Sequence, residues 1–282
     1  VWRAYGHEME PLLGEKAYRV MGDSHTPEYV RMLFDQMAHK DMIALTRQDP
    51  RYPPLLREIA DPPAALFVRG CMELQDAHTL AIVGTRHCTA YGAAMAEQIG
   101  ADLARAGVTV ISGLARGIDG AAQRGAARAG GRTVAVLGSG VDRIYPPEHE
   151  KLAEEILAAG GSLVSEYGPD VQAWPQHFPA RNRIISGMSA GVLLVEAGEK
   201  SGALITVDFA MEQNREVYAL PGPANAGLSC APHRLIREGA RLVTCADDLL
   251  VDQRWPQDEA WMPMDGHAST ERGGNACIRS VG

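Results

Sequence analysis

The chain is poor in the residues that would hold a metal ion or cross-link a small fold. Its 282 residues contain five cysteines, an odd number, and no two of them form a C-x-x-C pair. The nine histidines are also scattered, and no H-E-x-x-H motif occurs. A disulfide framework needs cysteines in pairs, and a zinc site needs Cys or His ligands at close, repeated spacing. We therefore expect neither in this protein, and no other metal site.

Long hydrophobic runs are missing as well. No stretch of about 18 apolar residues exists, although 46% of the residues are hydrophobic, so the sequence predicts no membrane span. The opening residues, VWRAYGHEMEPLL, lack the basic and then apolar pattern of a secretion signal. We expect a cytoplasmic protein that does not associate with a membrane.

An excess of positive charge is also absent. Lys and Arg number 27 against 35 Asp and Glu, which gives a formal net charge of -8. That total argues against a protein that coats duplex DNA by bulk charge. Residues 78–250 are closer to balance, with 15 basic and 18 acidic side chains. A local basic groove is compatible with this composition, because the distribution of charge decides binding more than its sum.

The sequence divides into three parts. Residues 1–77 show helical spacing of apolar residues over 27–42, a proline-punctuated helix over 54–59 and a short strand over 65–68. This predicts a small N-terminal helical region with a lead-in strand. Residues 78–250 are regular and residues 251–282 are polar and Gly-rich without a period. The last part is typical of a linker or a disordered tail.

Short apolar runs alternate with amphipathic stretches throughout residues 78–250. The predicted strands are 80–83, 108–111, 133–137, 163–165, 191–195 and 216–219. The predicted helices are 92–106, 118–129, 148–159, 182–188 and 204–213. Apolar strands separated by helices predict an α/β fold with a doubly wound, mostly parallel, Rossmann-like sheet.

Gly-rich loops follow the predicted strands, and cationic residues recur in or near them. In such a sheet, ligands bind at the carboxyl ends of the strands. Glycine allows close backbone approach, a helix start offers free N–H groups, and arginine adds a planar charged donor fork. These features predict a groove that binds phosphates and carries Arg86, Arg116, Arg181, Arg183 and Lys200, with Ser201 beside Lys200 ahead of a helix. Each glycine taken alone fits an ordinary βα turn, and the arginines could instead pair with carboxylates.

Aromatic side chains lie near the same loops. A ring beside cationic residues can stack an unpaired base. Phe178, three residues before Arg181, is the strongest stacking candidate, although it could equally pack beneath the Arg181 loop. The other rings near the predicted groove are Tyr91, Tyr145, Tyr167 and Trp174.

The fingerprints of nucleotide-dependent enzymes and hydrolases are missing. The sequence contains no G-x-G-x-x-G with a following ribose-binding acid and no G-x-x-x-x-G-K-[ST]. Its one G-x-S-x-G string, GMSAG at 187–191, precedes the predicted strand 191–195, whereas a nucleophile elbow follows a strand. Asp119, Glu166 and Glu196 could lie near strand ends, where carboxylates are more often helix caps or arginine partners than general acids. We therefore expect no catalytic residues and no cofactor.

The order of these motifs resembles the DNA processing protein A family, also called DprA or Smf. The resemblance covers roughly residues 49–250 and is most specific in SGLARGID and FPARNRII, with GTR, GSGVDRIYPPEH, EKSGALIT and HRLIREGA around them. It implies single-stranded DNA binding during natural transformation, loading of the RecA recombinase, and a homodimer built on an extended Rossmann fold. The family's strand-binding motifs here contain Arg86, Phe178, Arg181, Arg183, Lys200 and Ser201.

Some features depart from that family. Gln123 and His149 stand where the family usually has histidine and asparagine. The resemblance implies a sterile-alpha-motif-like domain in front and a winged helix behind, but residues 251–282 do not read as a winged helix. An alternative is a LOG-type, lysine-decarboxylase-like nucleotide phosphoribohydrolase, which shares Gly-rich loops. Its P-G-G-x-G-T-x-x-E motif has no counterpart in EAGEKSGALIT or PGPANAG.

Overall fold

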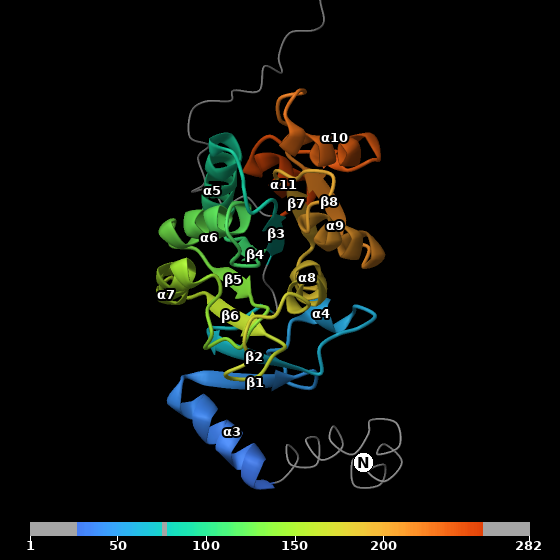
Figure 1. The fold of residues 1–282 in the computed structure, drawn as a ribbon. Helices are drawn as coiled ribbons and strands as arrows, with labels where there is room; N and C mark the ends of the chain where they lie inside the picture. The colour runs from blue at the N-terminus through green and yellow to red at the C-terminus, as the bar shows by residue number, and fades with distance from the viewer. Residues whose placement is uncertain (1–26, 75–77, 256–282) are drawn as a thin grey trace, which may run out of the picture.

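A nine-stranded sheet organises the computed structural model, which describes residues 27–74 and 78–255 (Figure 1). The strand order is β1-β2-β6-β5-β4-β3-β7-β8-β9. The strands are β1 (Met42–Thr46), β2 (Ala65–Gly70), β3 (Thr79–Val83), β4 (Thr109–Ser112), β5 (Thr133–Val136), β6 (Ser162–Ser165), β7 (Gly191–Leu194), β8 (Glu216–Ala219) and β9 (Arg241–Leu242). Neighbours from β6 to β9 pair in parallel, whereas β2 is antiparallel to both β6 and β1.

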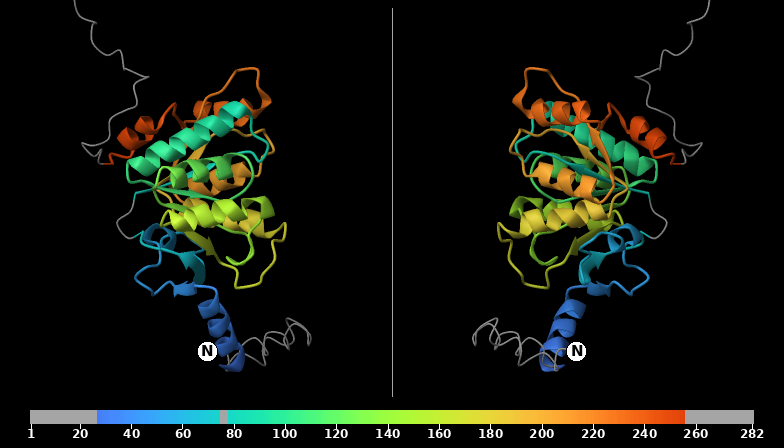
Figure 2. Two further views of the ribbon diagram at one scale, coloured as in Figure 1. Left: turned by 90° about the vertical axis from the view of Figure 1, so that its left-hand side faces the viewer. Right: turned by 90° about the vertical axis from the view of Figure 1, so that its right-hand side faces the viewer.

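Helices cover both faces of the sheet (Figures 1 and 2). They are α3 (Pro27–His39), α4 (Pro54–Arg57), α5 (Ala90–Arg105), α6 (Ile118–Arg128), α7 (Glu150–Ala158), α8 (His177–Gly187), α9 (Ala203–Glu212), α10 (Cys230–Arg237) and α11 (Ala246–Asp252), with short 3-10 turns η1 (Pro147–His149) and η2 (Gly227–Ser229). One face carries α5, α6, α7 and α11, and the other carries α4, α8, α9 and α10. Helix α3 packs beyond the edge strand β1.

The alternation of side chains along a strand explains the two hydrophobic layers. In β3, Leu80 and Ile82 join the layer under α5 and α6, while Ala81 and Val83 join the layer under α8 and α9. All four are buried, because successive side chains of a strand point to opposite faces and both faces are covered. The continuous apolar runs in the sequence follow from this double coverage. The predicted doubly wound, mostly parallel α/β fold is confirmed.

Helix α8 begins at His177, five residues before the predicted start at 182. The prediction treated Pro179 as a residue that precedes the helix. In the structure it occupies the first turn, where its missing N–H would have no partner in any case. This shift changes which side chains of the segment share a face. Helices α10 and α11, strand β1 and the short strand β9 were not among the predicted elements.

Described residues on the two sides of each predicted part boundary are in contact. Strands β1 and β2 extend the sheet through β6, so residues 42–70 share it with residues after 78. Helix α11 runs past residue 250, and the Trp255 ring stacks on His78 at 5.0 Å. The predicted tail from 256 onward, and the front of the predicted helical region up to 26, lie outside the described residues. Over 27–74 and 78–255, no helix is long and apolar enough to cross a bilayer.

The strand order places a switch point between β3 and β7. From β3 the chain winds outward through β4, β5 and β6, and then returns to place β7 on the other side of β3. The loops that follow β3 and β7 therefore leave the sheet in opposite directions. A crevice opens between such loops at the carboxyl ends of the strands, where open α/β sheets bind ligands.

Candidate nucleic-acid interface

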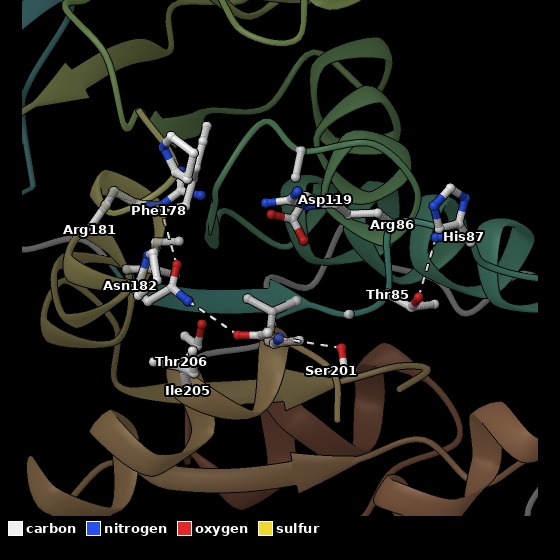
Figure 3. Close-up of a pocket in the computed structure, with 18 of the residues that line it drawn as sticks. Thr85, Arg86, His87, Asp119, Phe178, Arg181, Asn182, Ser201, Ile205 and Thr206 are labelled. Atoms are coloured by element: carbon white, nitrogen blue, oxygen red, sulfur yellow. Dashed lines mark hydrogen bonds between the residues drawn. The ribbon is translucent and has the colours of Figure 1, made fainter. Parts of the chain in front are cut away.

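A cavity of about 520 Å³ lies at this end of the sheet. Its walls come from the loop after β3 and from the beginnings of α6, α8 and α9 (Figure 3). Its polar and aromatic lining residues are Thr85, Arg86, His87, Asp119, Tyr145, Phe178, Arg181, Asn182, Ser201 and Thr206. The position agrees with the switch-point rule, and the lining combines cations, hydroxyls and rings.

Arg86 and Phe178 meet at the wall of the cavity. The guanidinium carbon of Arg86 lies 5.3 Å from the centroid of the Phe178 ring, which is a cation–π arrangement. Within residues 27–74 and 78–255, no carboxylate oxygen comes within the 4.0 Å ion-pair distance of Arg86. The side chain is exposed to solvent. An exposed guanidinium without a carboxylate partner is available to an incoming anion.

Arg181 lies much deeper, with 4% of its surface exposed. Its Nη1 donates to the carbonyl of Gly113 at 2.9 Å and to that of Val136, and its Nε donates to Asn182 Oδ1 at 3.3 Å. Three of the five guanidinium N–H donors are thus used inside the protein. Burial lowers the pKa of Arg181 to about 10, so the group remains protonated at neutral pH. Arg181 ties the loops after β4 and β5 to α8.

Asp119 supplies the buried negative charge near Arg181. Only 6% of it is exposed, and its Oδ2 accepts a hydrogen bond from Gly113 N at 3.1 Å. Burial raises the pKa of Asp119, and the charge of Arg181 opposes that rise. A Cβ on Gly113 would lie 2.6 Å from Arg181 Nη2 and 2.7 Å from Asp119 Oδ2, so this position requires glycine. The SGLARGID and FPARNRII motifs meet at this pair.

The predicted groove residues separate into two groups. Arg86, Phe178, Arg181 and Ser201 line the cavity. Ser201 Oγ accepts a hydrogen bond from Ala203 N at 3.3 Å at the start of α9. Arg116, Arg183 and Lys200 do not line it. Lys200 is exposed next to Ser201, and Arg116 pairs through its Nε with the carboxylate of Glu148.

Five polar lining residues were absent from the predicted groove: Thr85, His87, Asp119, Asn182 and Thr206. Asn182 Nδ2 donates to the carbonyl of Gly202 at 3.4 Å and so connects α8 to the start of α9. It stands between the two arginines of the RNR sequence, and Thr85 stands in the GTR sequence. Both residues are therefore sequence neighbours of predicted groove arginines. Their position in these motifs was the signal from which a place in the cavity could have been predicted.

The carboxylates near the strand ends are engaged with other protein groups. Glu196 accepts from Thr89 N at 2.8 Å and from Thr89 Oγ1 at 2.6 Å, next to the start of α5. Glu166 pairs with Arg183, and Asp119 lies beside Arg181. Among the described residues, no group of three His, Cys, Asp or Glu side chains is arranged to hold a metal ion. The cavity lining offers groups for ion pairing, hydrogen bonding and stacking.

The family model of DNA recombination-mediator protein A matches residues 43–254, which is most of the chain. The chain belongs to this family. It is 46% identical over 212 residues to Protein Smf of Escherichia coli K12, and 44% identical over 204 residues to DNA processing protein DprA of Streptococcus pneumoniae. These matches cover 75% and 72% of this chain, and 56% and 72% of the two relatives.

Solved structures of family members have the same fold. The X-ray structure of DNA processing protein A from S. pneumoniae matches with a TM-score of 0.70 at 40% identity, covering 81% of this chain and 82% of that one. A structure of DNA processing protein A from Helicobacter pylori, described for its single-stranded DNA binding mode, matches with a TM-score of 0.67 at 28% identity. That match covers 76% of this chain and 95% of the H. pylori chain.

The second arginine of the FPARNRII motif has a different environment from the first. Arg183 Nη2 donates to Glu166 Oε1 at 2.8 Å, and its Nε donates to Asp61 Oδ2 at 3.1 Å. Its side chain is 12% exposed, against 31% for Glu166 and 84% for Asp61. Arg183 thus connects α8 to the loop after β6 and to the segment between α4 and β2. These contacts indicate a structural role away from the cavity.

Replacing Arg183 with alanine is expected to lower the free energy of unfolding by about 1–3 kcal/mol, because the partly buried Glu166 carboxylate loses its partner. Asp61 contributes little to this loss, since an exposed ion pair is worth less than about 1 kcal/mol. Urea unfolding measures the change. Arg128→Ala is the matched control, because the Arg128 side chain is 62% exposed and its ion-pair partner Glu97 is 40% exposed. A stable Arg183→Ala protein that binds DNA more weakly would instead indicate direct strand contact.

The two departures from the usual family residues lie in the core beneath the loop after β4. Gln123 is fully buried, accepts from Leu114 N at 3.0 Å and donates to the carbonyl of Val134 at 3.1 Å. His149 Nδ1 lies 2.8 Å from the carbonyl oxygen of Leu114. Both side chains thus bind the backbone of the same loop residue from two directions. Neither lines the cavity.

Proposed function

We propose that this protein binds single-stranded DNA without sequence preference at the cavity near β3 and β7, and acts as a recombination mediator. The observation that carries the proposal is the exposed Arg86 guanidinium, which lies over the Phe178 ring and has no carboxylate partner among the described residues. A phosphate can form an ion pair with the guanidinium while a base stacks on the ring face. Membership of the recombination-mediator family supports the same conclusion.

Sequence independence follows from the groups that the cavity offers. Cations recognise phosphates, which carry no sequence information, and every base has a π-face that can stack on an aromatic ring. The bases of a duplex are already paired and stacked on one another, so the Phe178 ring suits an unpaired base. An unpaired strand can instead place one nucleotide against Phe178 while its backbone passes Arg86. Single strands are therefore the expected ligand.

Further properties are proposed from the family alone. We infer that the protein acts as a homodimer in the cytoplasm, delivers the bound strand to the RecA recombinase and serves DNA uptake in natural transformation. None of these steps requires a catalytic group or a cofactor. The phosphoribohydrolase alternative would need a carboxylate available to the substrate. Glu196 accepts hydrogen bonds from Thr89, and Asp119, which lines the cavity, is buried beside Arg181.

Fluorescence anisotropy with labelled oligothymidine across a salt series tests this function. We expect tight binding of the single strand, weaker binding of its duplex, and an affinity that falls with salt by about 0.7 log units per log unit of salt for each phosphate neutralised. Thymidine monophosphate serves as the comparison ligand. Binding restricted to the monophosphate, or release of free base from it, would replace this proposal with the phosphoribohydrolase alternative.

A further inference from the structure

Tyr145 lies beside the cavity in the loop between β5 and η1, and its ring is 39% exposed. Its centroid lies 5.4 Å from that of the Phe178 ring, and the two ring planes are inclined at 45°. Both residues line the cavity. The site therefore has two neighbouring aromatic rings, of which the stacking proposal above uses only one.

The loop that carries Tyr145 is held in place by contacts on both sides. Ser139 Oγ donates to the carbonyl of Arg143 at 2.6 Å, which closes the turn before Tyr145. After Tyr145, Pro146 is buried and Glu148 pairs with Arg116 from the loop after β4. A ring that is exposed and yet held by its loop can receive a ligand without a large loss of conformational freedom. Arg116 thus supports the interface by fixing this loop, although it does not line the cavity.

The inclination of the rings determines how many bases they can hold. Two planes at 45° cannot sandwich one flat base, because stacking requires nearly parallel faces. Each ring therefore offers a face to a different base. Phe178 lies toward Arg86, whereas Tyr145 lies on the Arg116 side of the cavity. Two successive bases, splayed apart rather than stacked on each other, fit this arrangement.

We propose that Tyr145 is a second stacking residue, so that the site binds two consecutive unpaired nucleotides and not a single one. This inference rests on the proposed single-strand binding. It narrows the expected ligand to strands with at least two unpaired nucleotides, because a lone nucleotide would stack only on the Phe178 ring. Bound strands gain affinity from the second base through Tyr145.

Competition against labelled oligothymidine tests the second stacking position, with thymidine monophosphate and the dinucleotide pTpT as unlabelled competitors. The parent is expected to prefer the dinucleotide over the monophosphate by about fivefold or more, since one stacked base contributes at least that factor. Tyr145→Ala and Tyr145→Leu should lose most of this preference, because the second base then has no ring on which to stack. Tyr145→Phe should keep it, because the ring and not the hydroxyl is required.

Tyr91→Ala is the matched control, because Tyr91 is 44% exposed but does not line the cavity. Tyr145→Leu keeps apolar packing against Phe178, so it tests stacking even if the alanine variant folds poorly. An unchanged ratio of dinucleotide to monophosphate affinity in a folded Tyr145→Leu variant would overturn the inference. A parent protein that does not bind oligothymidine would instead overturn the proposed function itself.

Discussion

Replacing Arg181 with alanine is expected to destabilise the protein by about 3–5 kcal/mol, the largest stability effect among the groove residues. The substitution removes the hydrogen bonds to the carbonyls of Gly113 and Val136, and it leaves the buried Asp119 carboxylate without its neighbouring positive charge. Denaturant unfolding followed by circular dichroism measures the loss. The Arg128→Ala control should change the unfolding free energy by less than about 1 kcal/mol, because its ion pair is exposed.

A double-mutant cycle identifies the source of that loss. If the unpaired charge is the main cost, Asp119→Ala combined with Arg181→Ala will be less destabilising than the sum of the two single changes. Strict additivity would show instead that the cost comes from the lost backbone hydrogen bonds. Because Arg181→Ala affects folding, weaker DNA binding by this variant alone does not demonstrate a direct contact with the strand.

Replacing Arg86 with alanine is expected to weaken oligothymidine binding by about tenfold or more while leaving the unfolding free energy nearly unchanged. Arg86 is exposed and has no ion pair within the described residues, so the fold loses little beyond its contact with the Phe178 ring. The variant lacks one contact with a DNA phosphate, and it also lacks the cation that strengthens base stacking on Phe178. The loss should be similar for all base sequences, and the salt slope should fall by about 0.7.

Two further variants sharpen the Arg86 experiment. Arg86→Lys keeps the charge but loses the planar fork, so it should retain the salt slope and recover only part of the affinity. Arg128→Ala removes the same charge from a surface site away from the cavity, and it controls for the general electrostatic effect. An Arg86→Ala protein whose affinity stays within twofold of the parent would mean that the strand binds elsewhere.

The parallel sheet could be predicted from the sequence because its signal is local. A strand buried on both faces must be apolar at nearly every position, and a βα loop must turn within a few residues, so glycines mark its place. The runs around Ala81, Ile111 and Val192 carry this signal, and all three residues lie in the sheet. The position of Arg86 in the loop after β3 could therefore be predicted from the sequence.

The depth of each arginine could not be predicted from the sequence, because residue type does not determine burial. Arg181 and Arg183 are two positions apart, which on a helix of 3.6 residues per turn places them about 200° apart. They therefore cannot both face one groove. The 200° angle applies only if both arginines lie on the helix. The predicted helix began at residue 182, so it left Arg181 outside and the separation was missed.

Tertiary structure alone decided which partners each cation has. Glu166, Asp61 and Glu148 are separated from their arginines by 17, 122 and 32 residues, so no local pattern pairs them. The sequence by itself determined the fold class, the loops at the carboxyl edge and four residues that line the cavity, namely Arg86, Phe178, Arg181 and Ser201. The folded chain decided that Arg183 and Arg116 bind carboxylates and that Arg181 is buried, because ion pairing and burial depend on long-range packing.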